Sequence, residues 1–291
     1  MSQAWSRWPA PAKLNLFLHI TGRRDDGYHT LQTVFQLLDW GDEIALAPRT
    51  DGRIERVQGM AGVAPEDDLV VRAARRLLAH APAGSGADIA VTKRIPAGGG
   101  LGGGSSDAAT VLVALNAIWG CGLDIDALAA LGLALGADVP VFVRGRSAWA
   151  EGVGEVLTPI DLPERWYVVL DPRQPVPTGP LFQAPELTRD AAPTTIPRFL
   201  AGAEVSNAFE PVVAARYPAV AQGLMWLGRY GRARLSGSGG CMFVETVDEA
   251  QARGIASDCP EGFKASAARG VNRSPLTAAL EGFSCWGVAK R

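Results

Sequence analysis

Residues 96–109 read Pro-Ala-Gly-Gly-Gly-Leu-Gly-Gly-Gly-Ser-Ser-Asp-Ala-Ala. Six of the nine residues from Pro96 to Gly104 are glycine, so this segment cannot be the interior of a helix or strand. The preceding residues Ala87–Ile95 predict a strand, and apolar residues at helical spacing predict a helix opened and capped by Ser105 and Ser106. A strand, a glycine loop and a helix N-terminus in this order predict an anion-binding loop, because backbone N–H groups and the helix dipole both attract the anion.

The two standard phosphate loops fit this segment poorly. Gly98, Gly100 and Gly103 match Gly-x-Gly-x-x-Gly, but a dinucleotide fold also needs a second strand bearing an acidic residue about twenty residues later. Here Cys121-Gly122 leads into another predicted helix. The other loop ends in Gly-Lys-Ser/Thr, and this chain has no lysine between Arg94 and Ser106. A cation must therefore come from elsewhere in the chain.

Lys13 is the candidate cation. The chain has four lysines, and the other 24 of its 28 basic residues are arginines. Lys13 nevertheless stands in an apolar stretch whose alternation predicts a strand over Lys13–Ile20. A chance position on a strand edge and a site that needs a compact point charge both fit this composition.

Asp138 is the candidate base. Transfer of a phosphoryl group to an alcohol needs a carboxylate to receive the hydroxyl proton. Asp138 lies in Gly136-Ala-Asp-Val-Pro140, between a predicted helix and a predicted strand entry, where an ordinary turn aspartate is the alternative. A second glycine loop, Ser236–Gly240, suits either a close approach to a ligand or a tight turn between strands.

The length of 291 residues suggests about two domains, and we place them at residues 1–160 and 161–291, because the second is predicted to start near Asp161. Proline-rich segments at 171–180 and 191–197 predict long loops that face a ligand in the second domain. The predicted strands are 13–20, 30–38, 44–47, 87–95, 141–143, 147–150, 166–170 and 241–245. The predicted helices begin at Asp67 or Asp68, Ser105, Asp124 and Asp248.

Composition excludes several classes of protein. The net charge of −2 argues against a nucleic-acid binder, and 47% hydrophobic residues can form an ordinary core. No uncharged apolar run reaches about 18 residues, and Met1–Pro11 does not resemble a secretory signal. The sequence therefore predicts a cytoplasmic protein without a membrane segment. No pattern in it predicts an oligomeric state.

Five motifs, in order, resemble those of the GHMP small-molecule kinases. They are Ala10-Pro-Ala-Lys-Leu-Asn15 with Asp26-Gly-Tyr-His29, the segment 96–109, Gly136–Pro140, Leu235-Ser-Gly-Ser-Gly239, and Arg269-Gly-Val-Asn-Arg-Ser-Pro-Leu276. The resemblance covers nearly the whole chain, and it is greatest to the branch that acts on a cytidine diphosphate-linked methylerythritol. It implies a two-domain α+β kinase with ATP and substrate in the cleft between an N-terminal ATP-binding domain and a C-terminal domain.

The same resemblance implies roles for individual residues. Lys13 and Asp138 would be catalytic, and Asn15 would contact the methylerythritol hydroxyls. Tyr28 and His29 would contact cytidine, with Thr178 and Phe182 on the far wall, so that Tyr28 and Phe182 would stack on the base. The ATP loop would be Pro96, Ala97, Gly98, Gly99, Gly100, Leu101, Gly102, Gly103, Gly104, Ser105 and Ser106.

The implied reaction moves the γ-phosphoryl group of ATP to a hydroxyl of the small molecule, in a route to isoprenoid precursors. Mg²⁺ would arrive with the nucleotide, contacted by Ser106 or through water, because no carboxylate cluster predicts a protein metal site. Three alternatives are another GHMP kinase (homoserine, mevalonate or galactose type), a nicotinamide-dependent oxidoreductase, and a nucleotide-binding regulator without catalysis. One departure is Ala208, where an Asp is usual in relatives.

Overall fold

The computed structural model describes residues 4–25, 27–60 and 62–288. Its strands are β1 Ser6–Arg23, β2 His29–Arg49, β3 Ile54–Gln58, β4 Gly86–Thr92, β5 Ala148–Glu151, β6 Val156–Pro159, β7 Trp166–Asp171, β8 Arg234–Leu235, β9 Met242–Thr246 and β10 Lys264–Val271. Its helices are α1 Leu69–Leu77, α2 Gly103–Trp119, α3 Ile125–Leu133, α4 Val139–Arg144, α5 Thr178–Phe182, α6 Ile196–Leu200, α7 Glu210–Arg216, α8 Pro218–Leu227, α9 Glu249–Ser257 and α10 Pro275–Val288, with a 3₁₀ turn at Leu78–His80.

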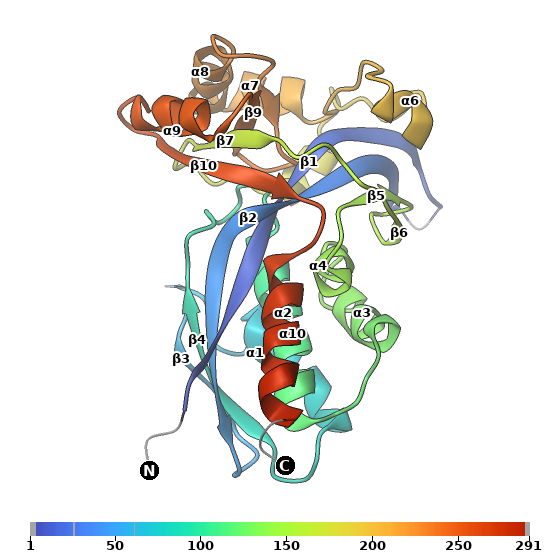
Figure 1. The fold of residues 1–291 in the computed structure, drawn as a ribbon. Coiled ribbons are helices and arrows are strands. Elements are labelled where there is room, and N and C mark those ends of the chain that lie inside the picture. The colour runs from blue at the N-terminus through green and yellow to red at the C-terminus, as the bar shows by residue number, and fades with distance from the viewer. Residues whose placement is uncertain (1–3, 26, 61, 289–291) are drawn as a thin grey trace.

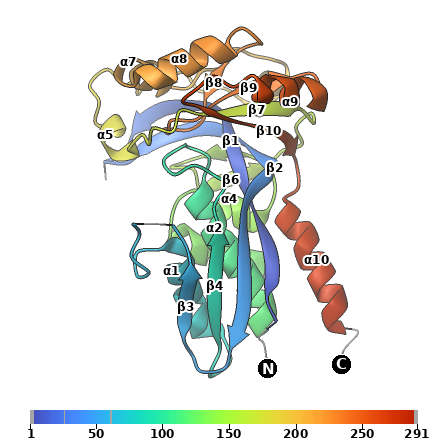
Figure 2. The same ribbon diagram turned by 90° about the vertical axis from the view of Figure 1, so that its left-hand side faces the viewer.

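The long antiparallel strands β1 and β2 run through both halves of the molecule (Figure 1). Below, β3 and β4 extend the sheet from β2, and helices cover one of its faces; above, β10, β7, β9 and β8 carry helices α7, α8 and α9 on their outer side (Figure 2). The strand order is β3-β4-β2-β10-β7-β9-β8, with β1 and β5 also paired to β2. The predicted α+β class is confirmed.

Three clusters of buried apolar side chains form the core. One joins the lower sheet to α1, α2 and α4, and Leu276 of α10 belongs to it. The second lies under the upper helices and includes Leu18 and Ile20 of β1. The third, between them, brings Phe17 and Trp149 together with Phe243 of the upper sheet. The cores therefore do not separate at residue 160, because β1 and α10 each pack side chains into the core of the other half.

Several predicted element starts are confirmed. Asp68, Asp124 and Asp248 cap α1, α3 and α9 with their carboxylates, which accept hydrogen bonds from N–H groups of the first turn. The predicted serine cap of α2 is wrong. Gly102 is the N-cap, in a left-handed conformation, and Ser105 lies within the first turn.

Two predictions about strands are also wrong. The stretches 30–38 and 44–47 belong to one strand, β2, because its pairing with β1 resumes beyond a register shift. Gly41 permits this close pairing, since a Cβ there would lie 2.1 Å from the Ala10 carbonyl oxygen.

Residues 141–143 are helical in α4, where Pro140 occupies the first turn and Gly145 ends the helix. A short apolar run does not by itself distinguish a buried strand from a buried helix.

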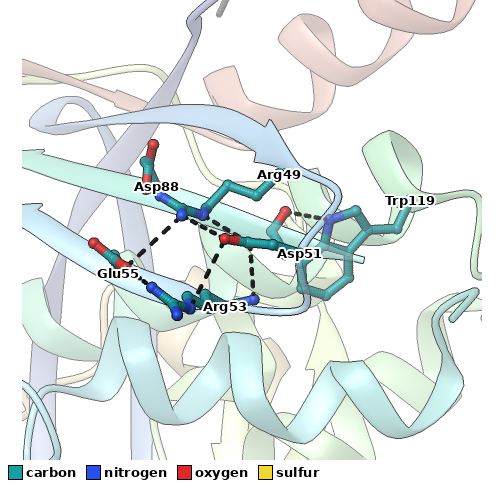
Figure 3. Close-up of polar contacts among 7 residues, drawn as sticks. Arg49, Asp51, Arg53, Glu55, Asp88 and Trp119 are labelled. Atoms are coloured by element: carbon teal, nitrogen blue, oxygen red, sulfur yellow. Dashed lines mark hydrogen bonds and ion pairs between the residues drawn. The ribbon is translucent and has the colours of Figure 1, made fainter. Parts of the chain in front are cut away.

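Ion pairs join β2, β3 and β4 at the end of the sheet where β4 begins (Figure 3). Arg49 donates to Asp88 at 2.7 Å and to Asp51 at 2.6 Å, and its hydrogen bond holds the pKa of the Asp51 carboxyl well below its usual range. Trp119 of α2 donates to the Gly86 carbonyl at 3.1 Å. These contacts fix the sheet far from Thr92, where the chain leaves β4 for the glycine loop.

Candidate active site

The glycine loop follows β4 and enters α2. Gly98, Gly100 and Gly102 have φ angles of +67°, +76° and +74°, which L-residues with side chains rarely adopt. Gly102 has no side chain to cap the helix, and the first-turn N–H groups of an α-helix have no partner within it. The loop lines a cavity of about 410 Å³ together with Lys93 and Asp107. This open, uncapped N-terminus fits a phosphate group.

Ser106 is buried behind the loop. Its Oγ has no hydrogen-bond partner among the described residues, and its side chain is 0% exposed. The orphaned hydroxyl is compatible with a ligand of a nucleotide-bound cation, as the sequence predicts, although the contact itself stays a prediction.

The two glycine loops interlock. Gly240 and Cys241 donate to the carbonyls of Gly98 and Gly99, each at 3.0 Å. A Cβ on Gly100 would lie 2.0 Å from the Ser236 carbonyl oxygen, and one on Gly239 would lie 2.0 Å from the Gly100 nitrogen. Segment 236–240 is thus both a turn between β8 and β9 and a brace for the first loop, which combines the two interpretations that the sequence left open.

Lys13 and Asp138 converge beside the first loop. Lys13 is 3% exposed, and its Nζ lies 3.3 Å from Asp138 Oδ2. The same ammonium donates to Asn15 Oδ1 at 2.5 Å and to the Gly100 carbonyl at 3.1 Å, and it lies 5.1 Å from the centre of the Phe35 ring. The predicted convergence of ammonium and carboxylate is confirmed, whereas their catalytic roles remain predictions.

Asp138 occupies the N-cap position of α4. Among the described residues its carboxylate makes no capping bond to that helix. The side chain is 34% exposed and borders a cavity of about 870 Å³ that Lys13 also lines. The carboxylate is therefore paired on one side and accessible to a ligand on the other.

Asn15 makes hydrogen bonds that the sequence did not predict. Its Oδ1 accepts from Lys13, and its Nδ2 donates to Thr33 Oγ1 at 2.8 Å. The Thr33 hydroxyl in turn donates to the Phe17 carbonyl. Asn15 lines the large cavity, so the predicted contact with substrate hydroxyls stays open, but its amide also orients the ammonium of Lys13.

The predicted substrate residues all face the large cavity. Its lining includes Asn15, Tyr28, His29, Thr178 and Phe182. Asp26, from the same sequence motif as Tyr28, lies outside the described residues. The large cavity and the loop cavity share Gly100 and Gly102 in their linings, so both border the same part of the glycine loop, and Lys13 and Asp138 line the large cavity.

The aromatic wall differs from the expected arrangement. The ring that stacks on Phe182 is His29, with centroids 5.1 Å apart and planes at 26°. Phe209 meets Phe182 edge-on at 4.9 Å, and Tyr28 is 65% exposed. A base held between Tyr28 and Phe182 stays a prediction. Thr178 shares a hydrogen bond of 2.9 Å with Ser238, which joins this wall to the second glycine loop.

Arg189 is a cavity residue that sequence reasoning missed. Its side chain contacts His29 and the end of α5. Nothing in Thr188-Arg189-Asp190 singles it out, because the contacts arise only when the loop after α5 returns to β2. Arg23 also lines the cavity.

A buried charge cluster lies where the chain leaves β4 for the glycine loop, and two of its members line the loop cavity. Lys93 contacts Asp42 and also donates to Asp107 at 2.8 Å. Asp42 accepts further bonds from the N–H groups of Arg94 and Ile95, whereas Asp107 Oδ1 has no partner among the described residues. Burial raises the pKa of Asp107 to about 7, because one ammonium cannot fully compensate two buried carboxylates.

The described residues contain neither a metal-binding cluster nor a membrane-spanning helix. Across ranges 4–25, 27–60 and 62–288, no group of three or more His, Cys, Asp or Glu side chains is placed to hold a metal ion. Within the same ranges, no helix combines the length and apolarity that a membrane crossing requires.

The chain matches the family models described as "GHMP kinases N terminal domain", over residues 68–146, and "GHMP kinases C terminal", over residues 191–265. The 4-diphosphocytidyl-2-C-methyl-D-erythritol kinase of Halorhodospira halophila is 61% identical to it, with 94% of this chain and 95% of that protein covered. The protein of the same name from Xanthomonas campestris is 60% identical over 96% of this chain and 95% of its own length.

Solved structures agree with these relatives. A crystal structure of 4-(cytidine 5'-diphospho)-2C-methyl-D-erythritol kinase matches with a TM-score of 0.80 and 35% identity, over 91% of this chain and all of the other. The mevalonate kinase of Methanococcus jannaschii shares the fold, with a TM-score of 0.66 and 16% identity over 93% of this chain and 99% of its own. The chain therefore belongs to the GHMP kinases and, within them, to the family of 4-diphosphocytidyl-2-C-methyl-D-erythritol kinases.

Proposed function

We propose that this chain transfers the γ-phosphoryl group of ATP to the 2-hydroxyl of 4-diphosphocytidyl-2-C-methyl-D-erythritol, giving the 2-phospho product and ADP in the methylerythritol phosphate route to isoprenoid precursors. The observation that carries the proposal is that two cavities border the glycine loop at Gly100 and Gly102, and that the Lys13–Asp138 pair lines the larger one. One cavity has the form of a phosphate site, and the other has the size of a nucleotide-linked substrate site.

In this proposal the glycine loop binds the phosphates of ATP. The nucleotide would supply the phosphoryl group, and Mg²⁺ would arrive bound to the nucleotide. Residues Pro96–Ser105 line the loop cavity, and Ser106 lies buried behind them with a hydroxyl that has no partner among the described residues. Binding there uses backbone N–H groups and the α2 dipole rather than a lysine within the loop.

Asp138 accepts the proton of the substrate hydroxyl. Its carboxylate lines the large cavity, where a substrate hydroxyl bound next to Lys13 would come within hydrogen-bond reach of it. Lys13 pairs with that carboxylate and balances the negative charge between the reacting oxygens. The transition state of phosphoryl transfer is loose, so positioning and electrostatics carry most of the catalysis.

The large cavity would hold the cytidine diphosphate portion. Tyr28, His29, Thr178 and Phe182 supply aromatic area and polar groups at its far end, and Asn15 stands near the reacting hydroxyl. Dependence on ATP also favours the cytoplasm as the location of the enzyme. No specific feature of the site favours a homoserine, mevalonate or galactose substrate, and the mevalonate kinase match at 16% identity supports a shared fold only.

The test is ADP release by the purified chain when ATP, Mg²⁺ and the cytidine diphosphate substrate are supplied. We expect the amount of ADP to equal the amount of a new phosphomonoester. Phosphorus NMR should show that this phosphate is attached to the 2-oxygen. Homoserine, mevalonate and galactose serve as control acceptors. ADP release with one of these and not with the cytidine substrate would reject the proposal.

A further inference from the structure

The side chain of Arg189 caps the C-terminal end of α5 and contacts His29 of β2. Its terminal nitrogens donate to three carbonyls: Leu187 at 3.0 Å, Phe182 at 3.0 Å and Ala184 at 2.7 Å. One of these carbonyls belongs to Phe182, the last residue of α5, and another to Ala184 in the turn after it, which also accepts from the Leu187 N–H. The guanidinium therefore fixes the segment that carries Phe182.

The Nε–H group of Arg189 meets His29 on β2. Arg189 Nε lies 3.3 Å from His29 Nε2 and donates to it. An imidazole nitrogen that accepts a hydrogen bond has no proton, so neutral His29 must have its proton on Nδ1. Because guanidinium never releases its proton in proteins, this assignment of donor and acceptor is fixed by chemistry.

The surroundings of His29 also favour its neutral form. Burial lowers the pKa of His29, and the positive charges of Arg189 and then Arg23 lower it further. Phe182, which stacks on the imidazole, has no charge to offset them. Among the described residues, no group accepts a hydrogen bond from Nδ1, and His29 lines the large cavity.

We propose that Arg189 is a positioning residue for the substrate cavity: it joins α5 to β2 and holds His29 as the neutral Nδ1–H tautomer, so that the ring presents one N–H donor to an acceptor on the bound nucleotide. This inference rests on the proposed function for the identity of that nucleotide. The arrangement of Arg189, His29 and Phe182 does not depend on it.

The consequence is a wall prepared before the substrate binds. A histidine free to exchange tautomers would present the wrong nitrogen for part of the time, and a protonated one would add a charge to the wall. Fixing one tautomer avoids both costs at the moment of binding, so the effect should fall on substrate affinity rather than on the chemical step.

The first experiment reads the tautomer in the unaltered chain without substrate. The chain has three histidines, so long-range ¹H–¹⁵N NMR correlations can assign His29 by comparison with His29→Gln. We expect the Nδ1–H form for the wild type, and in Arg189→Met a mixture of tautomers with a raised His29 pKa. A wild-type Nε2–H tautomer, or an unchanged tautomer and pKa in Arg189→Met, would overturn the proposal.

The second experiment separates KM from kcat. Arg189→Met should raise the KM for the cytidine substrate about tenfold, the scale of losing a hydrogen bond from a charged donor, and leave kcat within twofold. The matched control is Arg216→Met. Arg216 pairs with Glu186, which lies in the same loop as Arg189, but Arg216 does not line the cavity. Its KM should stay within twofold of the wild-type value.

Failure of this inference and failure of the proposed function give different results. A wild-type chain that releases no ADP with the cytidine substrate rejects the function, whereas the tautomer is still measured. Normal turnover with equal KM values in Arg189→Met and the wild type rejects the role of Arg189 only. Because the tautomer is read in the unaltered chain, the inference can fail even if Arg189→Met does not fold.

Discussion

At the residue scale, the ammonium of Lys13 has three polar neighbours. It donates hydrogen bonds to the amide oxygen of Asn15 and to the Gly100 carbonyl, and the third neighbour is the carboxylate of Asp138, with which it forms an ion pair. The first two hold the ammonium in place, and the third is the group that we propose receives the substrate proton. The charge of Lys13 is thus positioned by both the strand that bears it and the glycine loop.

Replacing Asp138 with Asn removes the proton acceptor and keeps the shape of the side chain. We expect kcat to fall about 10²–10⁴-fold, the usual contribution of a general base. The affinity for ATP should change little, because the loop cavity is not lined by Asp138. Steady-state ADP release and calorimetric titration of a non-hydrolysable ATP analogue measure the two effects. Turnover near the wild-type rate would refute the role of Asp138 as base.

Replacing Lys13 with Arg keeps the charge but enlarges the group. The Cε of Lys13 already lies 3.2 Å from where a Cβ on Gly102 would stand, and the side chain is only 4% exposed. A planar fork cannot reach the acceptors on Asn15, Gly100 and Asp138 with the same geometry. We expect kcat/KM to fall at least tenfold. Full activity would show that any positive charge suffices at this position.

At the element scale, the active site depends on contact between two glycine loops that lie about 140 residues apart in the sequence. Each loop is a turn in its own half of the fold, but their backbones approach too closely for a side chain on Gly100 or Gly239. The second loop therefore sets the shape of the first, and with it the shape of the loop cavity.

A methyl group on Gly239 tests this contact. In Gly239→Ala the new Cβ would lie 2.0 Å from the Gly100 nitrogen, so one loop must move. We expect a loss of about 1–3 kcal/mol in the free energy of unfolding, typical of overpacking, and a raised KM for ATP. Gly254→Ala is the matched control: it lies within α9 with nothing within 4 Å, and it should be neutral or slightly stabilising. Equal thermal midpoints for the two variants would contradict the interlock.

The sequence was most informative about elements with local chemical signals. Asp68, Asp124 and Asp248 cap the helices that they were predicted to start, and the glycine loop lies between β4 and α2 as expected. It was least informative about tertiary choices: α4 reads equally well as a strand, and Arg189 meets His29 only through the return of a loop. Stacking of His29 on Phe182 is likewise a packing outcome that residue types do not specify.

At the scale of the whole molecule, the two halves share structural elements. We retain residues 1–160 and 161–291 as the proposed extents of the two family domains. Across that boundary, however, β1 supplies Leu18 and Ile20 to the upper core, and α10 returns Leu276 to the lower one. Neither half has a complete core within its own stretch of sequence.

Asn272, between β10 and α10, ties the chain at the boundary. Its side chain donates to the Leu162 carbonyl at 2.8 Å and accepts from the Leu162 N–H at 2.9 Å. Nearby, Ser147 donates to the Asn272 carbonyl, so the segment is bonded to both halves. Replacing Asn272 with Ala should cost about 1–3 kcal/mol, because both groups of Leu162 lose their partner.

We therefore expect one cooperative unfolding transition for the full chain. Scanning calorimetry should give equal calorimetric and van't Hoff enthalpies, because neither half can keep its core once β1 or α10 is lost. Asn272→Ala should lower the midpoint of this single transition without splitting it, since the shared elements β1 and α10 remain. Two separate transitions in the wild type would show that the halves are independently stable, and that the middle cluster of Phe17, Trp149 and Phe243 does not couple them.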